Sequence, residues 1–312
     1  MHHFSRCVRI PFASALIALF ATQPAWGWGA DGHRMISRLA VRYLPPDVPG
    51  FLRNANALDT VEYLGPEPDR WRNHAEQELS DTQAPDHFLD LEYADLISPL
   101  PRKRYDFVRD LGAVQVLHPN LPLTPESVGL QPWAVEEMWQ KLKVDMREYR
   151  NLAAAHLDTR PDETAILYDA GVLSHYVGDG SMPLHTSFQY NGWNGTNPNH
   201  YTTEHHIHSQ FESVFVSANI KAADVAPLVA AAKPKVYADE WTSYLEYLHH
   251  THTYVEKVYQ LDKAGGFTDA GTPEAKAFTE ERLAAGAIEL RDLIYSAWVH
   301  SNDPIEEYHG AQ

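Results

Sequence analysis

The chain has 312 residues, a formal charge of −17, and 18 histidines against 17 glycines. With 44% hydrophobic residues and 8 Trp, 16 Tyr and 11 Phe, it can bury enough surface for one large domain or two small ones, which excludes intrinsic disorder. The negative charge excludes binding of long nucleic acids through bulk positive charge, because that affinity comes from Lys and Arg neutralising phosphates.

The first 27 residues are predicted to be a signal peptide. Two arginines precede an apolar run over 10–21, which is too short to span a bilayer, and residues 25–27 form a small-x-small cleavage pattern. Cleavage between Gly27 and Trp28 would remove both arginines, giving a mature charge of −19, and also Cys7, the only cysteine. Any metal would then be bound by nitrogen and oxygen. An uncleaved membrane anchor is the alternative. We expect a secreted or periplasmic protein without a transmembrane helix.

Helical periodicity dominates the remaining chain, and strand-like alternation is hard to find. Apolar residues at helical spacing predict helices over 36–43, 132–152, 166–177, 241–261 and 273–301. Pro45-Pro46 ends the first helix, and Thr272 followed by Pro273 is typical of an N-cap for the last. The stretch 118–125 is predicted to be a loop, and 186–203, rich in Asn and Gly, a long irregular segment. We therefore predict an all-α fold, as one domain over residues 28–312.

Two His-x-x-x-acid pairs follow the middle of the chain. His175 and Asp179 stand four apart on a predicted helix, which places them on one face within reach of one ion, and His185 lies just past the helix end. His208 and Glu212 repeat the arrangement. Facing pairs of this kind can bind metal in a helical bundle, whereas a surface contact is the alternative for each pair alone.

A second set of motifs lies earlier, in Asp69-Arg-Trp-Arg72 and His87-Phe88-Leu-Asp90. Taken singly, Asp69 is typical of a solvated charge and His87 of a histidine at the edge of a core.

The predicted mature N-terminus, Trp28-Gly-Ala-Asp-Gly-His33, is the third feature. A free α-amino group and the carbonyl of the same residue can chelate a metal. Signal cleavage would create that amine at Trp28.

These motifs occur together, and in this order, in one group of proteins. The chain resembles the superfamily of zinc-dependent phospholipases C and single-strand-specific zinc nucleases, with motifs from Trp28 to Glu212 that span about two thirds of the mature chain. The resemblance implies a mostly helical domain with three zinc ions in a cleft. It implies one zinc bound by Asp69, His87 and His175; a second by His185, His208 and Glu212; and a third by His33 and the amine and carbonyl of Trp28, with Asp179 bridging the first and third.

One ligand pair is ambiguous from the sequence. His200 and Glu204 also stand four apart, but His208 and Glu212 are preferred because Ser-Gln-Phe-Glu resembles the run found in the family. His205 and His206 are possible substitutes. The histidines without motif support are read as ordinary surface or core residues: His74, His118, His156, His249, His250, His252, His300 and His309.

The resemblance also implies a mechanism of phosphate-ester hydrolysis. A zinc-bound water is the nucleophile, Asp69 orients it or accepts its proton, and Arg72 holds a phosphate oxygen. Phe88 stacks on a base and Asp90 hydrogen-bonds its edge, which suits single-stranded nucleic acid. A surface salt bridge is the alternative for Arg72.

The substrate is predicted to be single-stranded nucleic acid or nucleotides, with a phospholipid headgroup as the alternative. The spacing from Trp28 to His33, the Asp-x-x-Arg motif and His-Phe-x-Asp favour a nuclease/3′-nucleotidase. Glu212, where such nucleases usually carry Asp, and the charge of −19 favour a phospholipase C, in which Phe88 would pack on a choline cation. The lack of cysteine also departs from the disulfide-bearing fungal nucleases. An inactive zinc-binding protein is a third possibility, and no obligate protein partner is implied.

Overall fold

The computed structural model describes residues 28–72 and 75–305. The predicted signal peptide over 1–27 lies outside these residues, as do His74 and His309. The prediction of an all-α fold is confirmed, since the described residues contain helices and two isolated β-bridges but no strand.

The helices vary widely in length. The longer ones are α1 (Gly29–Arg42), α6 (Arg104–Leu117), α8 (Gln131–Ala154), α9 (Arg160–Asp179), α13 (Glu240–His252) and α15 (Pro273–His300). Shorter helices are α2 (Ala55–Leu64), α3 (Glu67–Trp71), α4 (Gln77–Gln83), α5 (Leu91–Ala94), α7 (Pro125–Val128), α10 (Ile207–Ser209), α11 (Val216–Asn219), α12 (Ala222–Ala231) and α14 (Val255–Lys263). The 3₁₀ turns are η1 (Gly50–Arg53), η2 (Ala84–His87) and η3 (Pro183–Thr186), and η4 (Gln210–Phe215) is a π-helical stretch.

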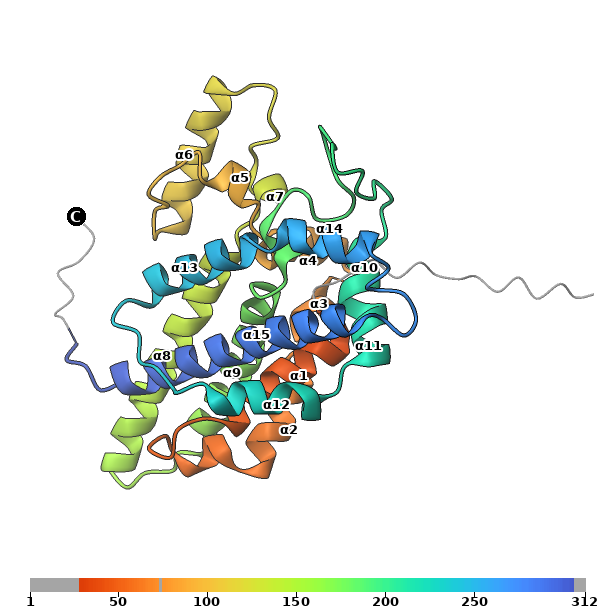
Figure 1. The fold of residues 1–312 in the computed structure, drawn as a ribbon. Coiled ribbons are helices and arrows are strands. Elements are labelled where there is room, and N and C mark those ends of the chain that lie inside the picture. Colours follow the sequence, from red (N-terminus) through yellow and green to blue (C-terminus); the bar gives the residue numbers. More distant parts are fainter. Residues whose placement is uncertain (1–27, 73–74, 306–312) are drawn as a thin grey trace, which may run out of the picture.

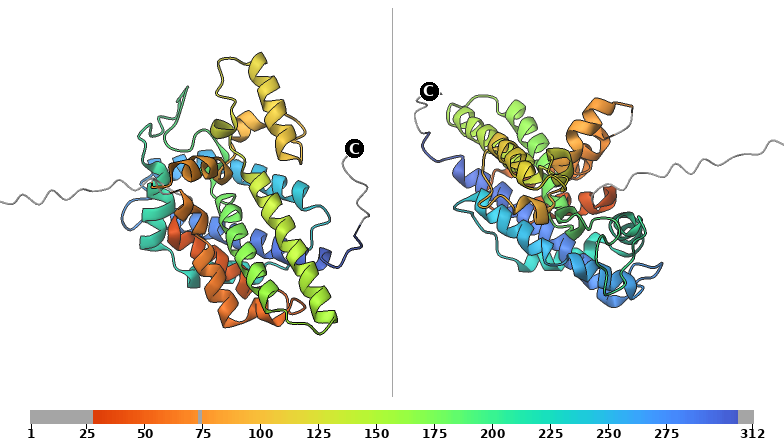
Figure 2. Two further views of the ribbon diagram at one scale, coloured as in Figure 1. Left: turned by 180° about the vertical axis from the view of Figure 1, so that it is seen from behind. Right: turned by 90° about the horizontal axis from the view of Figure 1, so that it is seen from above.

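The bundle is organised around α15 and α9. α15 packs against α1, α8, α9 and α12, and α9 also packs against α2 and α8 (Figure 1). Helices α5 to α7 and the irregular segment that follows η3 project from one end of the bundle, as the two further views also show (Figure 2). The chain enters the first projection after η2 and the second after η3.

Most of the predicted boundaries are confirmed. The side chain of Thr272 accepts a hydrogen bond from the backbone N–H of Ala275 at 3.2 Å and caps α15. Helix α1 ends at Arg42, before Pro45-Pro46, and the predicted helices over 132–152 and 166–177 lie within α8 and α9. No helix occurs between η3 and α10, as predicted for the irregular segment.

The prediction of one helix over 241–261 is wrong. The chain forms α13 and α14 instead, with a turn at Thr253 and Tyr254. The hydroxyl of Thr253 donates to the carbonyl of His250 at 2.7 Å, and its backbone N–H also reaches back to His249 and His250. Such local bonds compete with continued α-helix, and no proline or glycine marks the break.

Among the described residues, no single helix is long and apolar enough to cross a membrane. By length and composition only, the two helical segments Ile207–Asn219 and Ala222–Ala231 would together be long and apolar enough to cross a membrane. The chain bends by 99° between them.

The contact of α9 with α2 gives a stability prediction. A Cβ on Gly171 would lie 2.4 Å from Cβ of Leu64, so Gly171→Ala is expected to destabilise the protein by about 1–3 kcal/mol through overpacking. Gly112→Ala is the control, because Gly112 lies within α6 with no atom within 4 Å of an added Cβ, and it should stabilise by about 0.5–1 kcal/mol. Thermal unfolding measures both, and an unchanged midpoint for Gly171→Ala would contradict the close packing.

Candidate metal centre and substrate cleft

Asp179 lies at the centre of a cluster of four imidazoles. Helix α9 places His175 on the same face, and the carboxylate of Asp179 is fully buried. Its oxygens lie 3.3 Å from Nε2 of His175, 3.2 Å from Nδ1 of His87, 3.4 Å from Nε2 of His33 and 3.7 Å from Nδ1 of His185. Segments from α1, η2, α9 and η3 therefore converge on one carboxylate.

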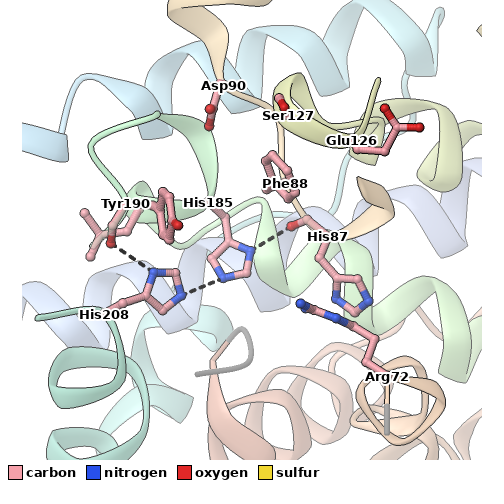
Figure 3. A pocket seen from close by; sticks show the side chains of 10 residues that line it. Arg72, His87, Phe88, Asp90, Glu126, Ser127, His185, Tyr190 and His208 are labelled. Atoms are coloured by element: carbon pink, nitrogen blue, oxygen red, sulfur yellow. Dashed lines mark hydrogen bonds between the residues drawn. The ribbon is translucent and has the colours of Figure 1, made fainter. Parts of the chain in front are cut away.

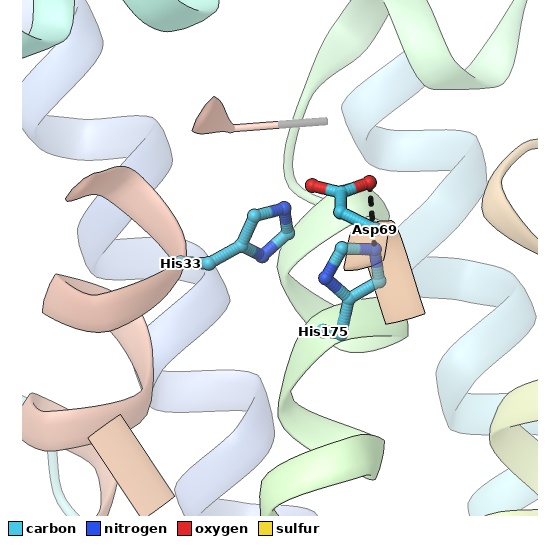
Figure 4. Close-up of side chains that lie close together, drawn as sticks. All are labelled: His33, Asp69 and His175. Atoms are coloured by element: carbon cyan, nitrogen blue, oxygen red, sulfur yellow. Dashed lines mark ion pairs between the residues drawn. The ribbon is translucent and has the colours of Figure 1, made fainter. Parts of the chain in front are cut away.

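Asp69 approaches this cluster from α3. Its Oδ1 lies 3.7 Å from Nε2 of His175 and 3.9 Å from Nδ1 of His87. Figure 4 shows Asp69 beside His33 and His175, whose rings stack at 4.0 Å. The structure thus brings together two groups with ligand atoms close enough to share an ion: His33, Asp69 and His175, and His87, His175 and Asp179.

A third group lies beside His185. Nε2 of His208 is 2.9 Å from Oε2 of Glu212 and 3.1 Å from Nε2 of His185. Glu212 lies in the π-helical stretch η4, a local irregularity often found at functional sites. His200 and Glu204, the alternative pair, are both exposed on the irregular segment and belong to none of the three groups.

Backbone carbonyls orient three of these imidazoles. Nδ1 of His175 lies 2.9 Å from the carbonyl of Gly65, and Nδ1 of His185 lies 2.7 Å from that of His87. Nδ1 of His208 lies 3.0 Å from the carbonyl of Tyr190. Because a carbonyl oxygen only accepts, each Nδ1 donates, and in its neutral form such a ring has an unprotonated Nε2 that can bind a metal.

Several buried atoms of the cluster make no hydrogen bond, although Nε2 of His33 and Oε2 of Glu212 among them lie within ion-pair distance of a neighbouring side chain. They are both ring nitrogens of His33, Nε2 of His87, Oδ1 of Asp69, Oδ1 of Asp179 and both carboxylate oxygens of Glu212. An unsatisfied buried polar group costs about 1–3 kcal/mol, so this many in one place fit a ligand that binds them all. Nitrogen and oxygen donors without thiolate suit Zn²⁺.

Without a cation the cluster has strongly shifted pKa values. Burial raises the pKa of Asp69 to about 7 and lowers that of His87 to about 4. Burial disfavours the charged form of Asp179 too, but His175 and His185 outweigh it and hold the pKa of Asp179 well below its usual range. Burial lowers the pKa of His185, but the negative charges of Asp179 and Glu212 outweigh this effect and raise the pKa to about 9. Burial thus favours the neutral forms of Asp69 and His87, whereas Asp179 and His185 favour their charged forms as an ion pair.

A cleft of about 470 Å³ opens over the cluster (Figure 3). It is lined by Arg72, His87, Phe88, Asp90, Glu126, Ser127, Leu184, His185, Tyr190 and His208. The backbone N–H of Asp90 donates to the carbonyl of Val128 at 2.8 Å, which holds the segment of Phe88 and Asp90 against α7. Burial, and to a lesser extent the negative charge of Glu92, raise the pKa of Asp90 to about 8. Arg72, Phe88 and Asp90 thus share one cleft with the candidate ligands.

Trp28 is fully buried next to the cluster. Its indole Nε1 donates to the hydroxyl of Ser181 at 2.6 Å, and its carbonyl accepts the backbone N–H of His33 at 3.2 Å. Its ring packs edge-on against Phe211 at 5.3 Å. The side chain is fixed within one turn of His33, and a role of Trp28 as a ligand stays a prediction.

Four cleft residues were not predicted from the sequence: Leu184, which precedes His185, and Glu126, Ser127 and Tyr190. Glu126 and Ser127 come from α7, and Tyr190 from the irregular segment. No spacing motif includes Glu126, Ser127 or Tyr190. The sequence offers only two weak signals: an acidic residue next to Pro125, and an aromatic residue within the Asn- and Gly-rich stretch.

Two solved structures give distant similarities. The alpha-toxin of Clostridium perfringens from avian strain SWCP is 15% identical, with a TM-score of 0.41 over 88% of this chain and 65% of that chain. The alpha toxin of Clostridium absonum is 12% identical, with a TM-score of 0.41 over 91% of this chain and 68% of its own. The chain thus spans about two thirds of the toxins' length. No curated protein matches it.

The family comparison covers nearly the whole described chain. The model of the S1/P1 nuclease family matches residues 28–298, from the predicted mature N-terminus to the end of α15. The match includes every residue of the metal cluster and the cleft, and it confirms the predicted resemblance. The chain belongs to the S1/P1 nuclease family, a family of zinc-dependent phosphate-ester hydrolases.

Proposed function

We propose that this chain is an exported zinc-dependent phosphodiesterase that acts as a single-strand-specific nuclease and 3′-nucleotidase. The observation that carries the proposal is the cluster of buried nitrogen and oxygen atoms around Asp179 that make no hydrogen bond, directly below a cleft that contains Arg72 and Phe88. Family membership supports the same class of reaction.

Three zinc ions are proposed. Asp69, His87 and His175 would hold one; His185, His208 and Glu212 a second; and His33 with the amine and carbonyl of Trp28 a third, with Asp179 shared between the first and third. When bound, zinc lowers the pKa of a coordinated water towards 7 and stabilises negative charge on phosphate oxygens.

Asp69 and Arg72 supply the protein's own part of the chemistry. Asp69 is positioned by α3 at the wall of the metal cluster, where its carboxylate orients the attacking water and accepts a proton. Arg72 follows three residues later and lines the cleft, where its guanidinium donates charge-assisted hydrogen bonds to a phosphate oxygen.

Phe88 and Asp90 would hold the base. Their side chains line the cleft above His185, Phe88 as an apolar ring and Asp90 as a buried carboxyl group (Figure 3). A stacked ring with a polar group at the base edge suits a splayed, unpaired nucleotide. The acidic charge of the chain argues against long-range capture of long polyanions and is compatible with short or single-stranded substrates.

A substrate panel tests the proposed function. Processed, zinc-loaded protein is expected to hydrolyse single-stranded DNA, RNA and a 3′-nucleotide, and to lose all three activities with a chelator. Phosphatidylcholine is the comparison substrate. Hydrolysis of phosphatidylcholine alone would replace the nuclease with a phospholipase C, and no chelator-sensitive hydrolysis of any substrate would leave only a zinc-binding protein.

A matched pair of histidine variants tests the second zinc site. His208→Ala is expected to reduce the zinc content from three ions per chain to two and to abolish hydrolysis, because two nitrogen and oxygen donors cannot complete that site. His200→Ala should keep three ions and full activity. Metal analysis of the purified proteins measures the content. The reverse result would assign the site to His200 and Glu204.

The N-terminal amine gives a separate prediction. A chain that begins at Trp28 is expected to bind three zinc ions, whereas the same chain extended by Gly-Ser before Trp28 should bind two and be at least about 100-fold less active, since acylation removes the amine as a ligand. Equal zinc content and activity in the two forms would remove Trp28 from the site.

Arg72, which directly follows α3, can be tested against Arg70 within that helix. Arg72→Lys is expected to lower kcat/KM for a 3′-nucleotide by about 100-fold with unchanged zinc content, because lysine keeps the charge but loses the fork of donors. Arg70→Lys is the control, since the Arg70 guanidinium lies 4.4 Å from the ring of Tyr63 and does not line the cleft. Similar kinetics for both variants would assign Arg72 a structural role.

A further inference from the structure

Tyr190 is an aromatic residue of the cleft that no motif includes. Its side chain lines the cleft and the residue is 54% exposed. Three nearby rings pack on one another instead: Trp193 and Tyr201 from the same segment and Tyr259 from α14. Trp193 packs at 4.9 Å on Tyr201 and at 5.2 Å on Tyr259, and Tyr201 and Tyr259 are 6% and 0% exposed. Tyr190 alone among these four rings presents its surface to the cleft.

The backbone around Tyr190 is held in place. Its carbonyl accepts the Nδ1–H of His208 at 3.0 Å. On either side, the hydroxyl of Tyr259 donates to the carbonyl of Gln189 and accepts the backbone N–H of Gly192 at 3.0 Å. A ring on a fixed backbone loses little conformational entropy when a ligand packs on it, so it gains more affinity than a ring on a mobile loop.

The surroundings of the ring indicate what it can bind. Phe88 and Tyr190 come from different segments, and Figure 3 shows them on either side of His185. Asp90, Glu126 and Ser127 place hydrogen-bonding oxygens along the same wall of the cleft. Two aromatic surfaces in a cleft that also contains hydrogen-bonding oxygens fit a flat, apolar-faced ring with N–H groups at its edge, which is the chemistry of a nucleobase.

We propose that Tyr190 is a specificity-determining residue that packs on the nucleobase of the bound nucleotide as a second aromatic surface, in addition to Phe88. The inference rests on the proposed function, because it places the phosphate of that nucleotide over the metal cluster. Tyr190 distinguishes substrates with a base from substrates without one. The carbonyl contact to His208 is retained in any substitution, whereas the ring of Tyr190 also packs edge-on against the ring of His208 at 6.0 Å, so the test must distinguish a base contact from an effect on His208.

Kinetics with and without a base test the proposal. Tyr190→Ala is expected to raise KM for adenosine 3′-monophosphate about tenfold, since stacking of one base contributes about 1–3 kcal/mol, with kcat changed less than about twofold. Ribose 3-phosphate, which lacks the base, should show no change in either constant. Tyr190→Phe should behave as the unchanged protein. Tyr105→Ala is the control, because Tyr105 is 84% exposed on α6 and does not line the cleft.

Two results would overturn the proposal. Equal losses with both substrates would mean that Tyr190 acts only through His208, and unchanged KM for both would mean that its ring does not contact the base. Equilibrium binding of adenosine 5′-monophosphate to the zinc-loaded proteins separates this inference from the proposed function. If the protein shows no hydrolytic activity but Tyr190→Ala weakens nucleotide binding about tenfold, the base contact is supported and the proposed enzymatic function is rejected. Absent or Tyr190-independent binding would reject the base contact.

Discussion

The structure depends on one buried carboxylate, that of Asp179. Four imidazoles from α1, η2, α9 and η3 lie within 3.7 Å of it, so the packing of these four segments brings their side chains together at one point. A lone buried carboxylate is strongly unfavourable, and this one is compensated by the neighbouring histidines in the absence of metal. The same arrangement leaves ligand atoms without hydrogen-bond partners, which gives a cation a large advantage over water at this place.

The proposed metal cluster would give the cleft a local charge opposite in sign to the net charge of the protein. The sequence is acidic, and on that ground it would repel phosphates. The proposed three Zn²⁺ ions would meet three ligand carboxylates, Asp69, Asp179 and Glu212, so the floor of the cleft would be positive within a negative molecule. Arg72 extends this positive region to the wall of the cleft. The positive charge at the floor of the cleft would therefore act on a bound phosphate at short range, and the negative charge of the whole surface would act on an approaching polyanion at longer range.

The sequence predicts the parts of this structure that follow regular spacing. The α-helical class, the long helices α8, α9 and α15 and the cap at Thr272 all follow from apolar periodicity and from the chemistry of helix ends. The i,i+4 pairs on α9 and at α10 to η4 could be placed on one face before any coordinates were known. The break between α13 and α14 could not, because it depends on the hydroxyl of Thr253 and no strong breaker stands there.

The walls of the cleft could not be predicted for a related reason. Metal ligands are restricted in type and spacing, so they leave a pattern in the chain. Glu126 and Tyr190 reach the cleft because α7 and the irregular segment fold over the bundle, and many residue types would be compatible with the same local backbone. Phe88 and Asp90 were identified only because they adjoin His87 in a motif shared with the family.

The carbonyl contacts of the imidazoles link metal capacity to the order of folding. His175 is oriented by a carbonyl 110 residues away in the chain, His185 by one 98 residues away, and His208 by one 18 residues away. No single helix, and no fragment that ends before η4, contains the complete set of donors together with the groups that orient them. Under the proposed zinc assignment, the full set of ions would therefore bind only to a chain that has folded at least through η4.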